Sequence, residues 1–350
     1  MKNILFDNII YSLQKSGGIS SMWSILLESM LNDDRFDLRC IEHSNSAINN
    51  IYRNSISLSS NEIIQEHSLL PLSIVRYRKV SSPNNNFSVF HSSYYRIPST
   101  PSLKTLITVH DFTYEKYVTG IRKKIHCQQK YNAINHADIV VCVSQNTYND
   151  LIHYLPHINK QKIHIIHNGI SSDFHNISNI SRGDNLLYVG SRSKYKNFEL
   201  LIETISETSH HIDICGAPLT HTEEKYLNKK LGNDRYTIYS NINNTQLNKL
   251  YNTAKCLIYP SSYEGFGLPI IEAQSAGCPV IALNSSSIPE VIGETPLLIE
   301  HATKNDLLKA ISNLENPTII EEVIEAGKIN ALRFSKNRMT NSYKELYLTL

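Results

Sequence analysis

The chain has 350 residues, of which 41% are hydrophobic and 19% are charged. This length predicts about two domains of roughly 150 residues each, and the composition excludes disordered, collagen-like and coiled-coil proteins. The 34 Lys and Arg against 32 Asp and Glu leave a formal net charge of +2. A chain without a global basic field is not expected to hold a nucleic-acid backbone, although a local basic cluster remains open.

Cysteine usage and the N-terminal residues indicate the compartment. The six cysteines form no Cys-x-x-Cys pair, and four of them lie in apolar runs, which is typical of buried thiols in a reducing environment. The apolar run 4–10 begins close behind Met1 and predicts a first strand, not a signal peptide. No apolar stretch reaches the roughly 18 residues of a membrane span. We therefore expect a cytoplasmic protein that at most rests on a membrane surface.

Short β-branched runs alternate with longer helical patterns in the first half of the chain, which predicts a parallel α/β sheet. The expected strands are 4–10, 36–42, 87–91, 105–110, 138–143 and 163–167. The expected helices are 19–31, 121–136 and 145–154. The polar segment 44–86 is rich in Asn and Ser, and we expect it to be a mobile loop with a short helix.

A polar stretch follows Gly169, and the alternation then begins afresh. The expected strands of the second half are 185–190, 211–215, 236–239, 256–259, 279–283 and 296–299. The expected helices are 197–208, 222–230, 244–254, 269–277 and 303–314, with one or two more in 318–349. The fold class is therefore α/β, with two doubly wound Rossmann-like domains and a cleft between them. In such sheets ligands bind beyond the carboxyl ends of the strands.

The most informative segment runs from Tyr259 to Ala273, where an apolar strand leads through two glycines into a helix. Gly265 and Gly267 let a backbone approach a ligand closely, and the unpaired N–H groups of the helix start favour an anion. A phosphate group fits such a turn, and Glu264 and Glu272 would flank one elongated ligand. The alternative is a plain tight turn with a solvated Glu264.

Two further segments follow expected strands. Arg192 and Lys196 are two cations placed to neutralise a diphosphate. The Gly17-Gly18 pair after the first strand suits backbone contact with a phosphate or sugar, although a plain turn would also need it. No Asp-x-Asp follows a strand and no His/Cys cluster has metal-ligand spacing, so we expect no catalytic metal.

The run from Tyr236 to Ile299 resembles the donor-binding half of the retaining GT-B glycosyltransferases of the glycogen synthase and mannosyltransferase type, that is, of the glycosyltransferase family 4 kind. Their signature is Glu-x7-Glu, which Glu264 and Glu272 match. The later blocks 276–281 and 287–291 are also similar. Weaker counterparts are Gly17-Gly18, His110-Asp111, Val143-Ser144 and Asn168-Gly169-Ile170.

The resemblance implies a role for each matching position. The implied catalytic residues are His110, Arg192, Lys196 and Glu264. The implied donor-binding residues are Gly17, Gly18, Gly190, Gly216, Ile242, Gly265, Phe266, Gly267, Leu268 and Glu272. Lys194 is an additional cation that we expect to be solvated, and Asp111 is expected to orient backbone rather than act as a base. A cluster of aromatic residues could stack on acceptor sugars or arise by chance: Tyr94, Tyr95, Phe112, Tyr114 and Tyr117.

The resemblance also implies the domain roles. These are an acceptor-binding domain 1–170, a linker 171–184, a nucleotide-sugar-binding domain 185–330 and a C-terminal helix 331–350 that packs back on the first domain.

The expected activity is that of a metal-independent retaining hexosyltransferase without a cofactor. GDP-mannose is the favoured donor and a UDP-sugar the second. The expected acceptor is a glycan or lipid-linked oligosaccharide of surface polysaccharide (lipopolysaccharide or O-antigen) biosynthesis, reached by peripheral contact with the inner face of the membrane and without a nucleic-acid partner. A sugar-nucleotide epimerase or hydrolase, and a non-catalytic nucleotide-sugar-binding protein, remain as alternatives.

Overall fold

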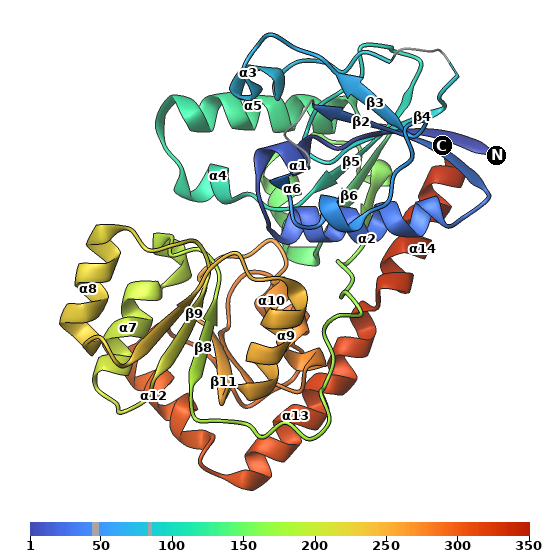
Figure 1. Cartoon of the computed structure of the whole chain (residues 1–350). Coiled ribbons are helices and arrows are strands. Elements are labelled where there is room, and N and C mark those ends of the chain that lie inside the picture. Colours follow the sequence, from blue (N-terminus) through green and yellow to red (C-terminus); the bar gives the residue numbers. More distant parts are fainter. Residues whose placement is uncertain (44–48, 83–85) are drawn as a thin grey trace. The chain divides into compact units, whose positions relative to one another are not determined.

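The computed structural model describes residues 1–43, 49–82 and 86–350 (Figure 1). The chain divides into two compact units, each with its own parallel sheet. Unit 1 consists of Met1–Gly169 together with Lys336–Leu350, and unit 2 consists of Ile170–Ser335. The C-terminal segment therefore leaves unit 2 and completes unit 1.

Unit 1 is built on a sheet that has seven parallel strands among the described residues, in the order β3-β2-β1-β4-β5-β6-β7. The strands are β1 Lys2–Asp7, β2 Phe36–His43, β3 Ile63–Glu66, β4 Val89–Ser92, β5 Lys104–Val109, β6 Ile139–Cys142 and β7 Ile163–Ile165. Side chains alternate between the two faces of β1, because Ile4 and Phe6 join one apolar cluster and Leu5 joins another. Both faces of this central strand are thus buried, as in other parallel sheets.

The α-helices of unit 1 are α1 Ile9–Leu13, α2 Gly18–Leu31, α3 Leu72–Val75, α4 Thr113–Tyr117, α5 Gly120–His136, α6 Gln145–Tyr154 and α14 Lys336–Thr349. Helix α14 supplies Met339, Tyr343 and Tyr347 to the apolar cluster that also holds Trp23. The Tyr347 hydroxyl lies 2.7 Å from Nδ1 of the buried His91. The last helix is therefore part of the core of unit 1.

Unit 2 is built on a sheet with six parallel strands among the described residues, in the order β10-β9-β8-β11-β12-β13. The strands are β8 Leu186–Val189, β9 Ile212–Cys215, β10 Tyr236–Tyr239, β11 Cys256–Tyr259, β12 Val280–Leu283 and β13 Leu298–Ile299. This is the strand order of dinucleotide-binding Rossmann sheets, whose switch point lies between the first and fourth strands. The loops after β8 and β11 meet at that point.

The α-helices of unit 2 are α7 Phe198–Ser206, α8 His221–Leu231, α9 Asn244–Thr253, α10 Leu268–Ser275, α11 Ile288–Ile292, α12 Lys304–Asn313 and α13 Pro317–Ala331. Apolar residues of α7, α12 and α13 pack on the buried strands β8, β9 and β11. No helix within the described residues is both long enough and apolar enough to cross a bilayer.

Several expected elements differ from the observed ones. The first strand ends at Asp7, and the apolar pair Ile9-Ile10 begins the short helix α1 instead. Within the expected loop 44–86, β3 pairs with β2 in parallel, and α3 is the expected short helix. Residues 44–48 and 83–85 of that expected loop lie outside the described residues. Helix α14 begins at Lys336, after a helical turn at 332–334 that separates it from α13.

Candidate functional site

The candidate site of unit 2 is formed by two loops that hydrogen bonds hold together. One loop, 190–197, follows β8, and the other, 260–267, follows β11. Asn197 has a left-handed backbone (φ 53°), and its Nδ2 donates to the Pro260 carbonyl at 2.7 Å and to Ser262 Oγ at 2.8 Å. The Ser262 N–H donates to the Tyr195 carbonyl at 2.8 Å. The two loops therefore form one fixed surface beyond the sheet.

Lys196 and Glu264 form an ion pair on this surface, between the Lys196 Nζ and Glu264 Oε1 atoms. Each side chain is 12% exposed, so the pair is largely removed from solvent but still reachable. Lys196 Nζ also lies 3.4 Å from Tyr259 Oη and 5.2 Å from the centre of the Tyr259 ring. The structure thus brings together two residues that lie 68 positions apart and that the sequence predicted at one site.

Two serines of the loop after β12 hold the backbone around Glu264. The Glu264 N–H donates to Ser286 Oγ at 2.8 Å. Ser287 Oγ donates to the carbonyls of Glu264 at 3.0 Å and Phe266 at 2.8 Å, and Ser287 is fully buried. Sequence reasoning did not assign these serines a role. The signal that could have found them is the run of small polar residues directly after a buried strand at the ligand-binding edge of the sheet.

Gly267 is the N-cap of α10 and has φ 112°. A Cβ at this position would lie 3.2 Å from Ile270 Cδ1, and the backbone conformation itself disfavours any other residue. The turn leads through Leu268 into Pro269, whose missing N–H costs nothing at a helix start. The expected tight turn therefore exists. In the first turn of α10, Pro269 has no N–H and the Ile270 N–H donates to the Gly267 carbonyl at 3.0 Å. The dipole of the helix still favours an anion at this end.

Glu272 lies in α10 and is 9% exposed. The Tyr251 hydroxyl of α9 donates to Glu272 Oε2 at 3.0 Å. Burial raises the pKa of the Glu272 carboxyl to about 7. A carboxyl with such a pKa changes charge near neutral pH and can accept or donate a hydrogen bond, as groups in ligand sites often do. Tyr251 was not predicted, because it belongs to no recognisable motif. Only the packing of α9 on α10 places its hydroxyl beside Glu272.

Arg192 points to a partner that the sequence did not predict. Its Nε and Nη2 donate to the Glu223 carboxylate at 2.7 and 3.2 Å, and its two Nη atoms donate to the carbonyls of Ala217 and Pro218 at 2.9 Å each. The hydrogen bonds from Arg192 lower the pKa of Glu223 to about 2. The guanidinium charge is therefore compensated by Glu223. Lys194 is exposed, as expected.

The glycines after β8 and β9 permit a close approach of two loops. A Cβ on Gly216 would lie 2.6 Å from the Gly190 carbonyl oxygen, which is too short for any non-bonded contact. Gly216 therefore has a steric reason in this fold, and Gly190 has a conformational one, because its φ of 146° lies in the range that favours glycine. Ile242 is half-buried in the loop after β10, the strand at one edge of the sheet, beside Asn241, which has φ 57°.

The predicted residues of unit 1 lie at the start of α2, which α1 separates from β1, and directly after β5. Gly17 is the N-cap of α2, and Gly18 is the first residue of this helix. His110 follows β5 and is buried, and burial lowers its pKa to about 4, so its imidazole is neutral at pH 7. Asp111 Oδ1 accepts a hydrogen bond from the Thr113 N–H at 2.8 Å, which is the backbone-orienting role expected for it.

The aromatic cluster of unit 1 is largely structural. Phe112 is fully buried and Tyr95 is 5% exposed. Tyr114 stacks on His126 with ring centres 3.7 Å apart. Tyr117 is 45% exposed. The interpretation of these rings as one acceptor platform is therefore wrong for Phe112, because no sugar can reach a ring that the core covers.

Comparison with known proteins adds family information to this geometry. Residues 171–328 match the model "Glycosyl transferases group 1", and residues 55–174 match the model "Glycosyltransferase Family 4". An uncharacterized 41.2 kDa protein in the cps region of Klebsiella pneumoniae is 24% identical over 97% of this chain and 99% of its own length. The O-antigen chain mannosyltransferase RfbU of Salmonella typhimurium is 28% identical over 60% of this chain. The matched part spans 60% of the RfbU chain.

Solved structures match the fold over the whole chain. The sucrose-phosphate synthase of Thermosynechococcus elongatus superposes with a TM-score of 0.79 and 16% identity, covering 100% of this chain and 99% of its own. HepE of Anabaena, solved in complex with UDP and glucose, gives a TM-score of 0.73 and 15% identity, covering 100% of both chains. At this level of identity the likeness concerns the fold. The two Rossmann-like sheets and the two family matches, which together cover most of the chain, support its identification as a glycosyltransferase with the GT-B fold.

Proposed function

We propose that this protein is a retaining, metal-independent glycosyltransferase of surface polysaccharide biosynthesis. It would move a hexose from a nucleoside diphosphate to a hydroxyl of a glycan or lipid-linked oligosaccharide. Similarity to the O-antigen mannosyltransferase RfbU supports GDP-mannose as the first donor candidate. HepE, which was solved with UDP and glucose, supports a UDP-sugar as the second.

The observation that carries this proposal is the pairing of Lys196 with Glu264 in the loop before α10, with Glu272 on α10 itself. A cation, a carboxylate and the positive end of a helix dipole on one fixed surface are complementary to the diphosphate and the hydroxyls of a nucleotide sugar. Glu264 would accept hydrogen bonds from the donor sugar. Glu272 would accept hydrogen bonds from the ribose.

The central difficulty of the reaction is charge. The diphosphate gains negative charge as the C–O bond to the sugar breaks, while the sugar becomes positive. Lys196 and the start of α10 would stabilise the leaving diphosphate, and because they are held in place beforehand they cost little reorganisation. This cationic group would take the place of a metal ion, so we expect activity to persist in excess EDTA.

Retention requires the acceptor hydroxyl to attack from the face that the diphosphate leaves. The proton of that hydroxyl would then pass to the departing phosphate oxygen, and no protein nucleophile is needed. His110 is neutral at pH 7 because it is buried, so it would present a hydrogen bond rather than a charge to the reacting sugar. Gly17 and Gly18 would contact the donor through their backbone.

Arg192 also belongs to the proposed donor site, where the Glu223 carboxylate binds it. The Arg192 guanidinium is held by the Glu223 carboxylate and two carbonyls, so it would act on the diphosphate by exchanging one of these partners for a phosphate oxygen. Gly190, Gly216 and Ile242, in the loops after β8, β9 and β10, would contact the nucleoside. Gly265, Phe266, Gly267 and Leu268 would line the diphosphate.

A thermal-shift screen tests the donor assignment. A ligand at 100 times its Kd adds about 2.7 kcal/mol to the free energy of unfolding, which raises the melting temperature measurably. We expect GDP to stabilise the protein most, UDP less, and ADP and dTDP least. If none of the four shifts the transition, the protein does not bind a nucleotide sugar. Release of free sugar from donor alone, as fast as with acceptor, would indicate the hydrolase.

A further inference from the structure

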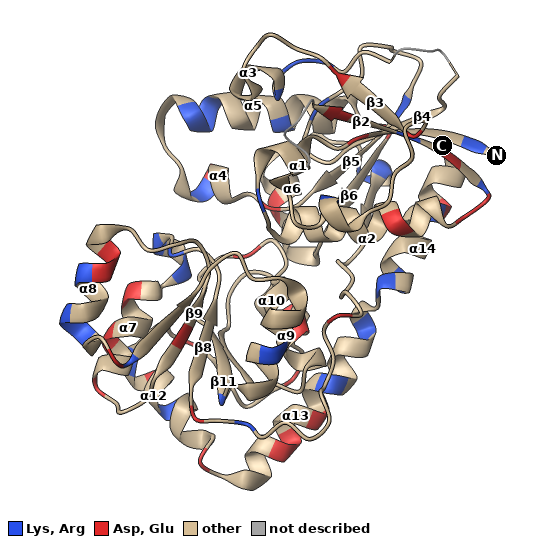
Figure 2. Cartoon of the chain, in the orientation of Figure 1, with Lys and Arg blue, Asp and Glu red and all other residues tan. Residues whose placement is uncertain are grey.

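The charge of the chain is strongly uneven. Residues 67–137 contain 10 of the 34 Lys and Arg but 2 of the 32 Asp and Glu, which leaves 24 against 30 for the rest of the chain. Figure 2 shows Lys and Arg on α5 in this segment. One of the two acids, Glu115, forms a buried ion pair with Lys130 at 2.8 Å. The near-neutral total therefore hides a basic region in unit 1.

A cavity of about 590 Å³ lies in this basic region. It is lined from three segments, 77–79, 95–97 and the α5 face 124–132. The lining residues are Tyr77, Arg78, Lys79, Tyr95, Arg96, Ile97, Lys124, Ile125, Gln128, Gln129 and Asn132. Four of them are cations, and none of these described lining residues is an acid. An anion is therefore the ligand that complements the cavity.

Hydrogen bonds of Arg96 hold part of the cavity wall together. Arg96 is 1% exposed, and its guanidinium donates to Glu66 Oε2 at 2.9 Å and to Asp7 Oδ1 at 3.1 Å. Its Nε donates to the Arg78 carbonyl at 3.3 Å, which anchors the segment 77–79. Two carboxylates compensate the charge of Arg96. The charge that a ligand would meet is therefore that of three exposed side chains, Arg78, Lys79 and Lys124.

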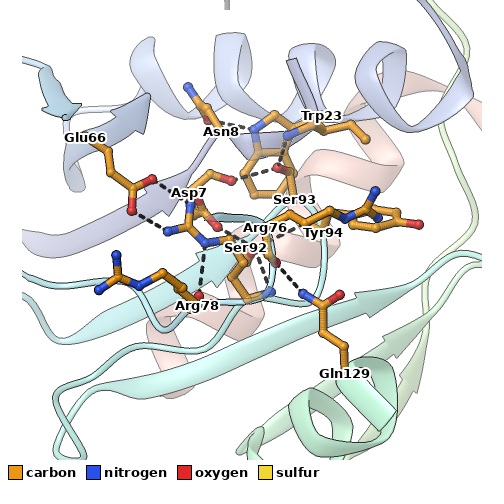
Figure 3. Close-up of polar contacts among 12 residues, drawn as sticks. Asp7, Asn8, Trp23, Glu66, Arg76, Arg78, Ser92, Ser93, Tyr94 and Gln129 are labelled. Carbon is orange, nitrogen blue, oxygen red and sulfur yellow. Dashed lines mark hydrogen bonds and ion pairs between the residues drawn. The ribbon is translucent and has the colours of Figure 1, made fainter. Parts of the chain in front are cut away.

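Helix α5 adds uncharged polar groups to the same wall. Lys124, Gln128 and Asn132 recur at intervals of four residues, which places them on one helix face. Gln129 Nε2 donates to the Arg76 carbonyl at 2.6 Å (Figure 3), and its Oε1 is buried without a partner among the described residues. An unpaired buried amide oxygen needs a donor, and a ligand hydroxyl would supply one.

Apolar side chains are exposed beside these cations. Ile125 and Tyr77, which line the cavity, are 45% and 43% exposed. Close to the lining segments in the sequence, four more apolar residues are exposed: Leu69 (106%), Leu70 (40%), Ile74 (48%) and Ile121 (69%). Exposed aliphatic groups among Lys and Arg are typical of surfaces that contact anionic lipid. A soluble anion would make no use of these groups.

We propose that this cavity binds the phosphate-bearing head of an amphiphilic acceptor, while the exposed apolar side chains contact its lipid chain or the surrounding lipid. This inference rests on the proposed function, because it assigns the chemical class of the acceptor: a lipid phosphate that carries the glycan. Arg78, Lys79 and Lys124 hold the phosphate. Gln129 and Asn132 hold hydroxyls of the attached sugar.

Calorimetric titration of the full chain with dodecyl phosphate, in the absence of nucleotide, tests this proposal. We expect binding that is at least tenfold tighter than that of inorganic phosphate, which lacks the chain, and of dodecyl maltoside, which lacks the charge. Equal binding of inorganic phosphate would overturn the amphiphilic assignment. Equal binding of dodecyl maltoside would overturn the role of the cations. Tighter binding of an oligonucleotide would assign the basic region to nucleic acid instead.

A matched pair of variants separates the cavity from general surface charge. Arg78→Gln removes an exposed arginine that lines the cavity, and Arg122→Gln removes an exposed arginine of α5 that does not line it. Loss of one charge-assisted contact should weaken dodecyl phosphate binding about tenfold in the first variant and less than twofold in the second. An equal effect in both would overturn the cavity as the site. Unchanged melting temperatures would show that both variants fold.

These experiments distinguish a failure of the cavity proposal from a failure of the proposed glycosyltransferase function. Nucleotide binding depends on unit 2 residues and is measured separately. Dodecyl phosphate binding without any nucleotide effect would leave the cavity standing and reject the donor site. If the protein binds nucleotide but binds dodecyl phosphate, inorganic phosphate and dodecyl maltoside equally, the proposed transferase function is retained and the cavity proposal is rejected.

Discussion

Lys196 and Glu272 are the residues on which donor binding should depend most. Replacing either by Ala removes a charged partner of the donor, and we expect a loss of about 1.5–3 kcal/mol in nucleotide-sugar binding, measured by calorimetry. Lys194→Ala is the matched control, because Lys194 is exposed in the same loop and should leave the affinity unchanged. Equal losses in Lys194→Ala and Lys196→Ala would show that the loop contributes only general charge.

The raised pKa of Glu272 predicts a pH dependence of stability. Its folded pKa of about 7 lies above the ordinary value of 4.5, so the folded protein holds this proton more tightly than the unfolded chain. The contribution to stability is therefore full at low pH and is lost as pH rises from about 4.5 through 7. Glu272→Gln lacks this loss, and its stability relative to the wild type should rise by as much as about 3 kcal/mol between pH 5 and 8.

Urea unfolding at several pH values measures this difference. Glu224→Gln, on the exposed surface of α8, provides the matched control, because it makes the same substitution away from the candidate site. A flat difference for Glu272→Gln would mean that Glu272 is ionised in the folded protein throughout this range.

The sequence predicted some residues of the candidate site much better than others. Lys196 and Glu264 lie in recognisable segments at strand ends, and the structure places them together. Ser287 was missed although it lies in a run of small polar residues after a buried strand. Tyr251 and Glu223 were not predictable as partners, because they reach the site through packing between elements and no local pattern reveals these contacts. The partner of Arg192 shows this limit, since a cation in a loop does not reveal which carboxylate will face it.

At the scale of elements, the close approach of the loops after β8 and β9 should make the fold sensitive to substitution at Gly216. Gly216→Ala would place a Cβ 2.6 Å from the Gly190 carbonyl, so one loop must move. We expect a loss of about 1–3 kcal/mol in the free energy of unfolding, together with weaker nucleotide binding. The neighbouring exposed substitution Ala217→Ser should change stability by less than about 0.5 kcal/mol. Full stability of Gly216→Ala would show that the loops are farther apart than described.

Helix α14 should contribute strongly to the stability of unit 1. Tyr347 is fully buried against Phe6, with ring centres 5.9 Å apart, and hydrogen-bonds His91. Tyr347→Ala should cost about 3–5 kcal/mol, as truncation of a buried aromatic ring generally does. The sole tryptophan, Trp23, is buried beside Phe6, so its fluorescence reports this core directly. Leu348→Ala, at a residue 41% exposed on the same helix, should leave the transition nearly unmoved.

Elements with strong apolar periodicity were predictable, and short ones were not. The strands β9, β10 and β11 and the helices α5 and α6 fall within a residue or two of their expected bounds. The strand β3 was missed because its sequence, Ile-Ile-Gln-Glu, is short and lies in a polar segment. Helix α1 was taken as strand because Ile9 and Ile10 continue an apolar run, and only the pairing of β1 with its neighbours ends the strand at Asp7.

At the scale of the whole molecule, the net charge does not show how unevenly the charged residues are distributed along the chain. A net charge of +2 argued against a global basic field, and this holds for the chain as a whole. The local basic cluster that the sequence left open lies in residues 67–137, where few acids accompany the cations. The sequence does not show that this cluster lines a cavity, because only the fold brings the segments 77–79 and 95–97 to the side of α5.

Transfer of labelled mannose from GDP-mannose to a lipid-linked acceptor, with the anomeric configuration of the product determined by NMR, tests the central claim most directly. The account predicts that the sugar keeps the anomeric configuration that it had in the donor, and that transfer falls at least a hundredfold in Glu264→Gln and Lys196→Ala but not in Lys194→Ala. A product of inverted configuration, or equal transfer by all three variants, would contradict it.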